Sequence, residues 1–434
     1  MKRVFTTEIG NYIGKEVTLL GWIHKLRKLG GISFLALRDK RGLAQAVIEK
    51  ASENIKLREL TTETVIKLTG KVVKEARASH GAEIRVKAVE IISAVKKDIP
   101  IAINKKELNI NMDTLLDNRP ITLRNPRQRA IFKVQSEIVA EFRRFLTEND
   151  FMEINSPKIV SSGVETGGAE MFRVDYFQKK AFLSQSPQMY KQIMVGVYER
   201  VFETAFTYRA EKHSTARHLN EYYSLDLEMG FIDSYEDVMD IEENYISSLI
   251  DRLKENCQEE FQILGAEIPQ RPKKIPRIKL KEAQRILEKE YQEKCLGAPD
   301  LDPKQEKIIC EYSTKKLGSE FIFITHYPSK KRPFYAYNNP RNPKETLSFD
   351  LLFRGLEVTT GGQRLHLYND YIRKMKDRYL KPEDFADYLS IFKYGMPPHG
   401  GLAIGLERLT ARLLNLNNVR EASLFPRDIN RLKP

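Results

Sequence analysis

Cysteine is scarce in this sequence. Only Cys257, Cys295 and Cys310 occur among 434 residues, without C-x-x-C spacing or a histidine cluster nearby. Neither a disulfide framework nor a structural zinc site is indicated, and a reducing, cytoplasmic location is expected. Long apolar segments are also missing, because no run reaches eighteen residues and the first ten residues lack an apolar core. These absences argue against a membrane-spanning helix and a secretory signal.

Two common nucleotide-binding signatures are absent, G-x-G-x-x-G and the P-loop pattern G-x-x-x-x-G-K-[ST]. Without them, and without an alternation of strands and helices, a wound parallel sheet is not expected. Acidic residues are fewer than basic ones: the chain has 59 Asp and Glu and 72 Lys and Arg, which gives a net charge of +13. Such an excess favours a polyanionic partner, because clustered cations displace counterions from a phosphate backbone.

The N-terminal part of the chain contains five short apolar segments separated by turn signals. Regular spacing of this kind predicts a small closed barrel, and a helical segment near Asn54–Thr62 after the third strand matches the oligonucleotide-binding (OB) architecture. We therefore predict an OB-fold domain over residues 1–100, with strands at residues 17–23, 33–39, 43–49, 65–73 and 82–92.

A second domain is predicted over residues 129–434. Residues 101–128 are rich in Asn and Pro and are expected to be a hinge. From residue 129 the apolar residues follow helical spacing to about Asn149, and the strand-like run FMEINSPKIV comes next. Further antiparallel-looking strands indicate an α+β domain. Within it, residues 235–320 are highly charged and are predicted to form a solvated helical region with little chemistry of its own.

The segment Tyr208–Met229, YRAEKHSTARHLNEYYSLDLEM, has residue types that suit a nucleotide site. Arg209 and Glu211 are two apart at the end of an apolar run, so on a strand they share one face. A cation, a carboxylate and an aromatic side chain suit a nucleotide. The alternative is a surface hairpin with its charges in solvent, and this segment alone leaves both open. After Glu211 the segment continues with a polar loop and a second strand. Together they carry Lys212, His213, Arg217, His218, Tyr222, Tyr223 and Glu228.

The segment LSQSPQMYKQIM predicts the start of a helix. Ser186 can cap this helix and Pro187 can occupy its first turn. Gln188 and Lys191, three apart, then lie on one helix face. They can offer an amide and a positive charge to a small polar ligand. The alternative is an ordinary solvated helix face.

The segment SFDLLFRGLEVTTGGQRLH predicts a hairpin. If Arg354 and Gly355 form a two-residue turn, Leu352 pairs with Glu357, and Asp350 lies on the same face as Glu357. Two converging carboxylates suit Mg²⁺, which prefers hard oxygen ligands. The alternative, two solvated acids on a surface hairpin, is disfavoured because the apolar neighbours indicate a buried strand.

Two further patterns lie in the C-terminal part of the chain. Gly361–Gly362 lets the backbone approach a ligand, and Arg364 just beyond can meet a carboxylate with two parallel hydrogen bonds. In the stretch GLAIGLERL, small residues precede an amphipathic helix that begins near Arg408. At that place Arg408 can contact phosphates or the face of a purine.

Taken in order, these segments resemble the three signature motifs of class II aminoacyl-tRNA synthetases, in particular the aspartyl-tRNA synthetases of the short archaeal and eukaryotic type. The resemblance spans nearly the whole chain. The helix with FMEINSPKIV and its Pro157 is similar to motif 1, YRAE with its loop and YYSLDLEM to motif 2, and GLAIGLERL to motif 3. Asp150 is a departure, since motif 1 usually has Gly there.

The resemblance implies an aspartate--tRNA ligase that is a homodimer. Mg·ATP and L-aspartate would give aspartyl-adenylate and pyrophosphate, and the 3′-terminal adenosine of tRNA(Asp) would then accept the aspartyl group. Such catalysis depends on positioning and on preorganised positive charge. The first step needs no general base, because the substrate carboxylate is already ionised.

The resemblance also implies roles for single residues. As catalytic residues, Arg209 would hold the α-phosphate, Glu211 the adenine or the tRNA end, and Arg408 the outer phosphates. Arg217 would share the outer phosphates with Arg408. With Tyr222 stacked on adenine, the set implied for ATP is Arg209, Glu211, Arg217, His218, Leu219, Tyr222, Glu357 and Arg408.

Metal and amino-acid binding are assigned by the same resemblance. Asp350 and Glu357 would hold the principal Mg²⁺. Lys191 and Arg364 would clamp the side-chain carboxylate, where two cations favour Asp over neutral Asn. Related asparaginyl enzymes often have an acid at the position of Lys191. A mobile lid, GVETGGAE, would cover the substrate, and the remaining residues implied for aspartate are Glu165, Ser186, Gln188 and Arg209.

In the barrel, GWIHKLRKLGGISFLALRDKRGLAQAVI resembles an anticodon-binding module. Phe34 would stack on an anticodon base, as recognition of single-stranded RNA requires. Archaeal enzymes specific for tRNA(Asp) tend to have Trp at the position of His24, whereas those that also charge tRNA(Asn) tend to have His there and a small residue near Ser79. The resemblance thus implies a nondiscriminating enzyme, with an anticodon set of His24, Arg27, Phe34, Gln45, Ser79 and Glu83.

Three other functions remain open. The first is an asparaginyl enzyme, which Lys191 and FDLLFRGLEV disfavour. The second is a catalytically silent paralogue that binds RNA through its barrel, and the joint presence of the expected catalytic side chains argues against it. The third is an ammonia-dependent amide-forming enzyme with the same adenylate chemistry, for which the barrel would be unnecessary.

Overall fold

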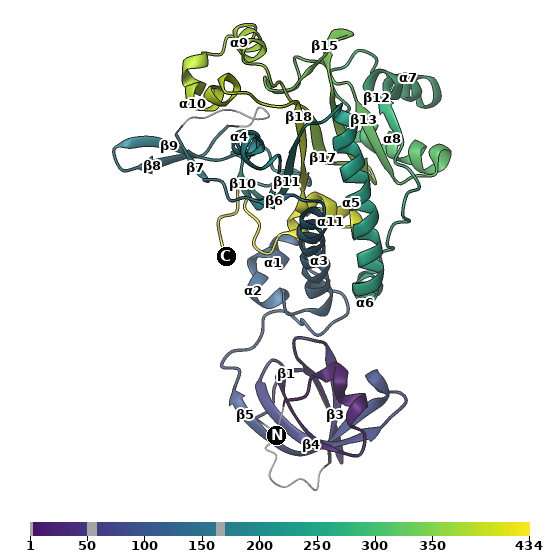
Figure 1. Cartoon of the computed structure of the whole chain (residues 1–434). Coiled ribbons are helices and arrows are strands. Elements are labelled where there is room, and N and C mark those ends of the chain that lie inside the picture. Colours follow the sequence, from purple (N-terminus) through teal and green to yellow (C-terminus); the bar gives the residue numbers. More distant parts are fainter. Residues whose placement is uncertain (1–2, 50–58, 162–169) are drawn as a thin grey trace. The chain divides into compact units, whose positions relative to one another are not determined.

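The computed structural model describes residues 3–49, 59–161 and 170–434 (Figure 1). The chain divides into two compact units, residues 1–108 and 109–434. The boundary falls inside the segment predicted as a hinge. Most of the helix predicted near Asn54–Thr62 lies outside the described residues, as do Glu165 and most of the predicted lid.

The first unit is a closed barrel with the strand order β1-β2-β3-β5-β4. Apolar side chains alternate along its strands, as in β4, where Ile66, Leu68 and Val72 are buried. These side chains join a single core inside the barrel, so the predicted OB architecture is confirmed. Its elements are η1 Thr6–Tyr12, β1 Glu16–Leu29, β2 Ile32–Arg38, β3 Leu43–Glu49, β4 Val65–Lys74, η2 Ser79–Gly81 and β5 Ala82–Ser93.

The second unit is built around an eight-stranded sheet with the order β12-β13-β16-β17-β18-β11-β10-β6. Most neighbours in it are antiparallel, which confirms the predicted α+β class. Two smaller sheets, β7-β9-β8 and β14-β15, complete the strands of this unit. All its strands are β6 Met152–Glu153, β7 Ile159–Val160, β8 Arg173–Tyr176, β9 Lys179–Leu183, β10 Arg200–Tyr208, β11 Glu221–Gly230, β12 Arg277–Lys279, β13 Phe321–Thr325, β14 Asn338–Asn339, β15 Asn342–Thr346, β16 Ser348–Phe353, β17 Leu356–Gln363 and β18 His399–Gly405.

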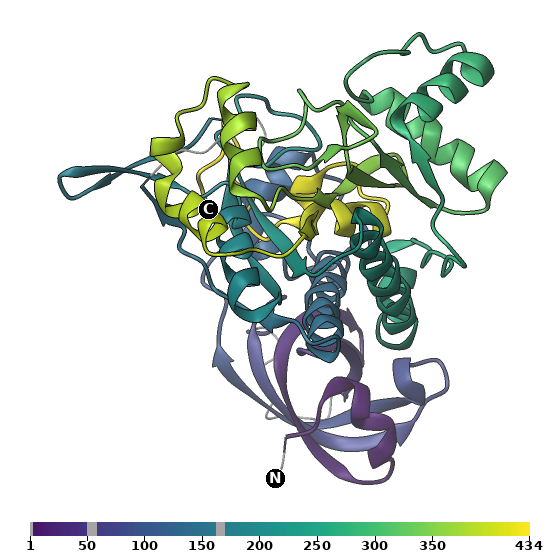
Figure 2. The same cartoon turned by 45° about the horizontal axis from the view of Figure 1, so that its top comes forward.

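Helices pack against this sheet. Side chains of α3, α5 and α11 join the sheet in the main core, which includes Phe142, Leu249 and Phe349. The yellow-green α9 and α10 lie beside α4 (Figures 1 and 2), where their apolar side chains pack against Met189 and Ile193. The helices are α1 Met112–Asp117, α2 Arg119–Thr122, α3 Pro126–Glu148, α4 Gln188–Tyr198, α5 Tyr235–Asn256, α6 Gln258–Leu264, α7 Leu280–Tyr291, α8 Pro303–Tyr312, α9 Tyr368–Lys376, α10 Ala386–Ser390 and α11 Leu406–Leu413.

Three local predictions need correction. Helix α3 begins at Pro126, three residues before the predicted start at residue 129. Asn125 caps it, since its Oδ1 accepts a hydrogen bond from the Arg127 N–H at 2.9 Å, and proline suits a first helical turn. FMEINSPKIV forms two separate short strands, β6 and β7, instead of one. Helices α1 and α2 occupy part of the predicted hinge.

The prediction of a solvated region at residues 235–320 is wrong, although the region is largely helical. Tyr245 and Leu249 of α5 are buried in the main core. Leu287 of α7 and Ile309 of α8 belong to a second core against β13 and β16. The region therefore supports the sheet from two sides, and Glu306 on α8 also reaches the polar site described below.

The three cysteines are free and buried. Burial raises the pKa of the Cys257 and Cys310 thiols to about 12, so both remain protonated at neutral pH. Among the described residues, no helix is both long enough and apolar enough to cross a membrane.

Candidate active site

Strand β16 separates the main core from a polar site. Its Phe349 and Leu351 belong to that core, so Asp350 between them faces the other side of the sheet. The turn after β16 has the predicted form. Both residues of Arg354–Gly355 have positive φ angles, 45° and 82°, as a two-residue hairpin turn of type I′ requires.

Asp350 and Glu357 meet across this hairpin as predicted, together with an unpredicted hydroxyl. Leu352 pairs with Glu357, and a register shift next to it lets Asp350 pair with Thr360. Thr360 Oγ1 donates a hydrogen bond to Glu357 Oε1 at 3.0 Å. Asp350 Oδ1 is buried without a hydrogen-bond partner among the described residues. These three oxygen-bearing side chains fit Mg²⁺, whose preferred ligands are hard oxygens.

Arg332, a residue that no sequence pattern marked, neutralises Asp350. Its Nη2 donates to Asp350 Oδ2 at 2.6 Å, and its guanidinium carbon is 3.9 Å from the ring centre of Tyr327. Burial nevertheless raises the pKa of Asp350 to about 6, and the neighbouring Glu357 adds to the rise against the effect of Arg332. Arg332 comes from the loop after β13, 18 residues before Asp350.

Arg209 lies at the end of the predicted β10–β11 hairpin. β10 ends at Tyr208, so Arg209 and Glu211 lie just beyond the strand, where the Glu211 N–H donates a hydrogen bond to Arg209 O at 2.8 Å. The Arg209 N–H donates to Asn220 O at 2.8 Å. The guanidinium carbon is 5.5 Å from the ring centre of Tyr222, and Nε is buried without a hydrogen-bond partner in the described part of the chain. Such a cation beside an aromatic ring suits the phosphate and base of a nucleotide.

Arg217 ties the loop between β10 and β11 to two other elements, α8 and α11. Nη2 of Arg217 donates to both carboxylate oxygens of Glu306 on α8, at 2.8 Å each. Arg408 at the start of α11 donates through Nε to Arg217 O at 3.4 Å and through Nη1 to Glu357 Oε1 at 3.3 Å. The predicted phosphate-binding cations therefore lie beside the predicted metal ligand.

His218 and Leu219 complete the loop. Nδ1 of His218 is 2.7 Å from Thr215 Oγ1. Burial and the nearby Arg408 lower the pKa of His218, so its ring is neutral at pH 7. Leu219 is buried in the main core and anchors the loop to it.

Lys191 and Arg364 lie in buried positions around one carboxylate. Lys191 Nζ is 2.8 Å from Asp226 Oδ1 and 3.6 Å from Glu228 Oε2. Arg364 Nε donates to Glu228 Oε1 at 2.8 Å, and Gln188 Nε2 donates to Glu228 Oε2 at 3.1 Å. Although burial opposes it, Arg364 and Lys191 hold the pKa of Glu228 below its usual value. Two buried acids thus balance the two cations.

This balance changes the basis for selecting an amino acid. The sequence prediction relied on the net charge of Lys191 and Arg364, but Asp226 and Glu228 cancel it. What remains is Nη1 of Arg364, from which no described residue accepts a hydrogen bond. A substrate carboxylate can take that donor. Asp226 was not among the predicted site residues, although its spacing of two from Glu228 on β11 places both on one face.

Glycines keep this corner compact. A Cβ on Gly401 would lie 2.2 Å from Glu228 Oε2, and one on Gly361 would lie 2.4 Å from the Phe349 ring. Gly361, predicted to let the backbone approach a ligand, therefore makes room for a core side chain instead.

Helix α4 begins at Gln188, and Pro187 occupies its N-cap position instead of the predicted first turn. Ser186 Oγ still accepts a hydrogen bond from the Gln188 N–H at 3.2 Å. Gln188 and Lys191 share a buried face, as the spacing predicted.

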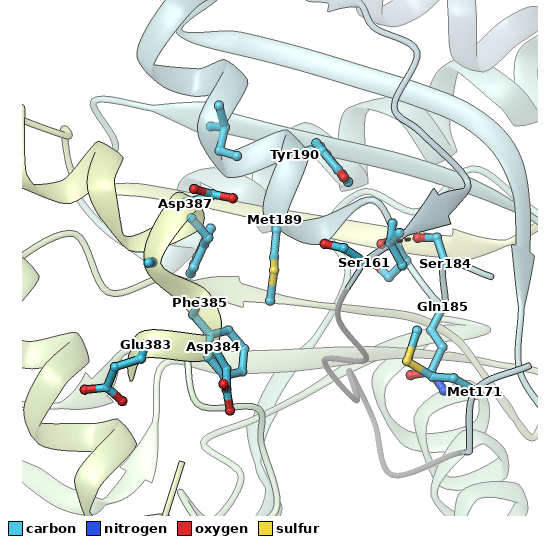
Figure 3. Close-up of a pocket in the computed structure, with 15 residues that line it drawn as sticks. Ser161, Met171, Ser184, Gln185, Met189, Tyr190, Glu383, Asp384, Phe385 and Asp387 are labelled. Atoms are coloured by element: carbon cyan, nitrogen blue, oxygen red, sulfur yellow. Dashed lines mark hydrogen bonds between the residues drawn. The ribbon is translucent and has the colours of Figure 1, made fainter. Parts of the chain in front are cut away.

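A hollow beside α4 is distinct from these charged groups (Figure 3). Residues of α4 and residues 383–388 line it. Met189 projects into it between Phe385 and Ser161 in the view of Figure 3. Ser186 is the one predicted site residue among its described lining. The hollow therefore adjoins the predicted amino-acid site without containing its cations.

The outer face of the barrel gathers four of the predicted anticodon residues. Arg27 pairs with Phe34 in the β1–β2 register, so both side chains point the same way. On the adjacent strands, Gln45 Nε2 donates to Glu83 Oε2 at 2.8 Å. Phe34 is half-buried, which leaves an accessible aromatic face beside polar groups.

The other two predicted anticodon residues lie apart from this face. His24 is only 6% exposed, and its Nδ1 is 3.5 Å from Nη1 of Arg38. Arg38 in turn forms a buried ion pair with Glu63 at 2.7 Å. Ser79 is exposed in η2, between β4 and β5. His24 thus belongs to an internal polar network.

Two protein families match the two units. The family described as tRNA synthetases class II (D, K and N) matches residues 111–429. The family described as OB-fold nucleic acid binding domain matches residues 17–92.

Similar proteins cover the whole chain. The Aspartate--tRNA(Asp/Asn) ligase of Deinococcus radiodurans is 48% identical over 439 residues, which cover 100% of this chain and 99% of the relative. The ligase of the same name from Thermus thermophilus is 48% identical over 435 residues and is covered completely, as is this chain. The solved structure of asparaginyl-tRNA synthetase from Pyrococcus horikoshii complexed with asparaginyl-adenylate has a TM-score of 0.93 and 31% identity, with 100% of each chain covered.

Proposed function

This chain belongs to the class II tRNA synthetases of the D, K and N group, and we propose that it ligates aspartate to tRNA. As an aminoacyl-tRNA synthetase it is a ligase. The observation that carries the choice of aspartate is Arg364, buried beside Lys191 with Nη1 still available. A carboxylate offers two acceptor oxygens to such donors, whereas the amide of asparagine offers one.

In the proposed first step, the α-carboxylate of aspartate attacks the α-phosphate of ATP and pyrophosphate leaves. Arg209 would bind the α-phosphate and Tyr222 the adenine, while Arg217 and Arg408 would bind the outer phosphates. Fixed cations of this kind stabilise the charge that develops in the transition state. Mg²⁺, when bound, would neutralise phosphate charge. The residues that would hold this ion are Asp350, Glu357 and Thr360.

In the proposed second step, a hydroxyl of the terminal adenosine of tRNA attacks the carbonyl carbon of the adenylate and AMP leaves. Glu211, two residues from Arg209, would guide the tRNA end. The outer face of the barrel would hold the anticodon, with Phe34 stacked on one base.

Amino-acid-dependent exchange of pyrophosphate into ATP tests the first step. We expect exchange with aspartate and none with asparagine or lysine. Arg209→Ala should lower the exchange rate at least about a hundredfold, because one fixed donor is typically worth that much. Lys212→Ala is the matched control, since Lys212 is exposed in the same loop. Exchange with asparagine, or full exchange in Arg209→Ala, would contradict this assignment.

We also propose that both tRNA(Asp) and tRNA(Asn) are charged. Both relatives described above have names that include the two tRNAs, and this chain has His24 and Ser79 at the positions linked with relaxed choice. Aspartylation of the two transcripts tests the proposal. A preference for tRNA(Asp) above about a hundredfold, nearly 3 kcal/mol, would count against it.

A homodimer is the proposed assembly. β6 ends the eight-stranded sheet, and its apolar residue Met152 is half exposed. An open edge with apolar neighbours is a common surface for association. Light scattering of the purified protein should give twice the mass of one chain, and a monomer at micromolar concentration would refute the proposal.

A further inference from the structure

Glu306 is a buried acid in the proposed ATP site to which the two-step reaction assigns no role. It lies on α8 and is 6% exposed. Another acid, Glu357, donates a backbone hydrogen bond to Glu306. Burial of a carboxylate beside a second one costs free energy unless its oxygens are well paired.

Both oxygens of Glu306 are paired with groups that the reaction uses. Each accepts a hydrogen bond from Nη2 of Arg217 at 2.8 Å. Oε2 also accepts one from the backbone N–H of Glu357 at 3.1 Å. One carboxylate thus holds a proposed phosphate-binding cation and the backbone of a proposed metal ligand.

Arg408 joins the same two residues from the other side. Its Nε donates to Arg217 O at 3.4 Å, and its Nη1 donates to Glu357 O at 3.2 Å. Arg217 and Glu357 therefore each form hydrogen bonds with both Glu306 and Arg408. The four residues form a closed ring that links the β10–β11 loop, α8, β17 and α11.

The ring holds Arg217 without using up its donors. No described residue accepts a side-chain hydrogen bond from its Nε or Nη1, and its side chain is 19% exposed. These donors remain for phosphate oxygens while Glu306 fixes the guanidinium. A long side chain that is already ordered loses less conformational entropy when the ligand binds.

We propose that Glu306 is a positioning residue that preorganises Arg217 and Glu357 for the triphosphate of ATP. This inference rests on the proposed function, since it assumes that ATP binds at this site. Glu306 makes no direct contact with Lys191 or Arg364 among the described hydrogen bonds and ion pairs. Its loss should therefore affect ATP and spare the amino acid.

The test compares Glu306→Gln and Glu306→Ala with the wild type in two assays, aspartate-dependent pyrophosphate exchange and calorimetric binding of Mg·ATP without amino acid. In both variants we expect KM and Kd for ATP to rise about tenfold or more, equivalent to about 1.4 kcal/mol. KM for aspartate should stay within about twofold. Glu311→Gln is the matched control, because Glu311 is exposed on the same helix, and it should match the wild type.

A double-mutant cycle separates positioning from a general effect on the fold. Glu306→Gln combined with Arg217→Ala should weaken ATP binding by clearly less than the sum of the two single losses. Additive losses, unchanged ATP affinity, or an equal rise in KM for aspartate would overturn the proposal. The proposed function is tested separately, by which amino acid supports pyrophosphate exchange in the wild type. The role of Glu306 is tested by Mg·ATP binding, which does not depend on which amino acid is the substrate.

Discussion

Glu242 on α5 is a buried acid without the partners that Glu228 and Glu306 have. It is 1% exposed, and neither of its carboxyl oxygens has a hydrogen-bond partner among the described residues. Burial raises its pKa to about 8. Glu242 is therefore protonated at neutral pH, and its ionisation would work against the fold.

The sign of the pH dependence follows from that shift. The folded pKa lies above the unfolded value of about 4.3, so the stability from neutral Glu242 is fully present below pH 4 and is lost as pH rises toward 8. Glu242→Gln removes this titration with little change of shape. Between pH 5 and pH 8 the wild type should lose about 3–4 kcal/mol of its free energy of unfolding relative to the variant.

Urea unfolding at the two pH values measures this difference. Glu255→Gln is the matched control, since Glu255 is exposed on the same helix. A gap between variant and wild type that stays constant from pH 5 to pH 8 would show that Glu242 is not protonated in the folded state.

At the scale of single elements, the β16–β17 hairpin could be predicted because Arg354–Gly355 determines its turn and thereby its register. The partners of its acids could not. Arg332 reaches Asp350 from the loop after β13, and Glu306 comes from a helix 89 residues beyond Arg217. A charged helix does not reveal in its sequence which of its acids will be buried, so only tertiary packing identifies them.

Strand β18 must lie very close to β11 for the amino-acid site to form. Gly401 pairs with Glu228, and a Cβ there would be 2.2 Å from both Leu227 O and Glu228 Oε2. Gly401→Ala should displace the Glu228 carboxylate from Arg364. We expect KM for aspartate to rise about tenfold or more, and Tm to fall by several degrees, since a local clash costs about 1–3 kcal/mol.

The same strand offers a control for this clash. In Gly405→Ala the nearest neighbour of the new Cβ would be Arg408 Cδ at 3.6 Å, an ordinary contact distance. Its Tm should stay near that of the wild type. An unchanged KM for aspartate in Gly401→Ala would mean that Glu228 does not support the substrate through Arg364.

At the scale of the whole molecule, the two units have separate cores. The barrel core and the main core share no residue in the described chain. All residues proposed for ATP and aspartate lie in residues 109–434, and the proposed anticodon residues lie in residues 1–108. The order of motifs along the chain predicted this division, because each motif is local in sequence.

Residues 109–434 alone should therefore retain the first step and lose efficiency only in the second. We expect aspartate-dependent pyrophosphate exchange within a few-fold of the full chain, and aminoacylation of tRNA(Asp) lowered at least about tenfold, because each stacked base is worth about 1–3 kcal/mol. In the full chain, Phe34→Ala should weaken aminoacylation in the same direction and leave exchange unchanged. If the shortened chain has native circular dichroism but no exchange, the barrel supports the catalytic unit directly, and the separation of the two steps between the units fails.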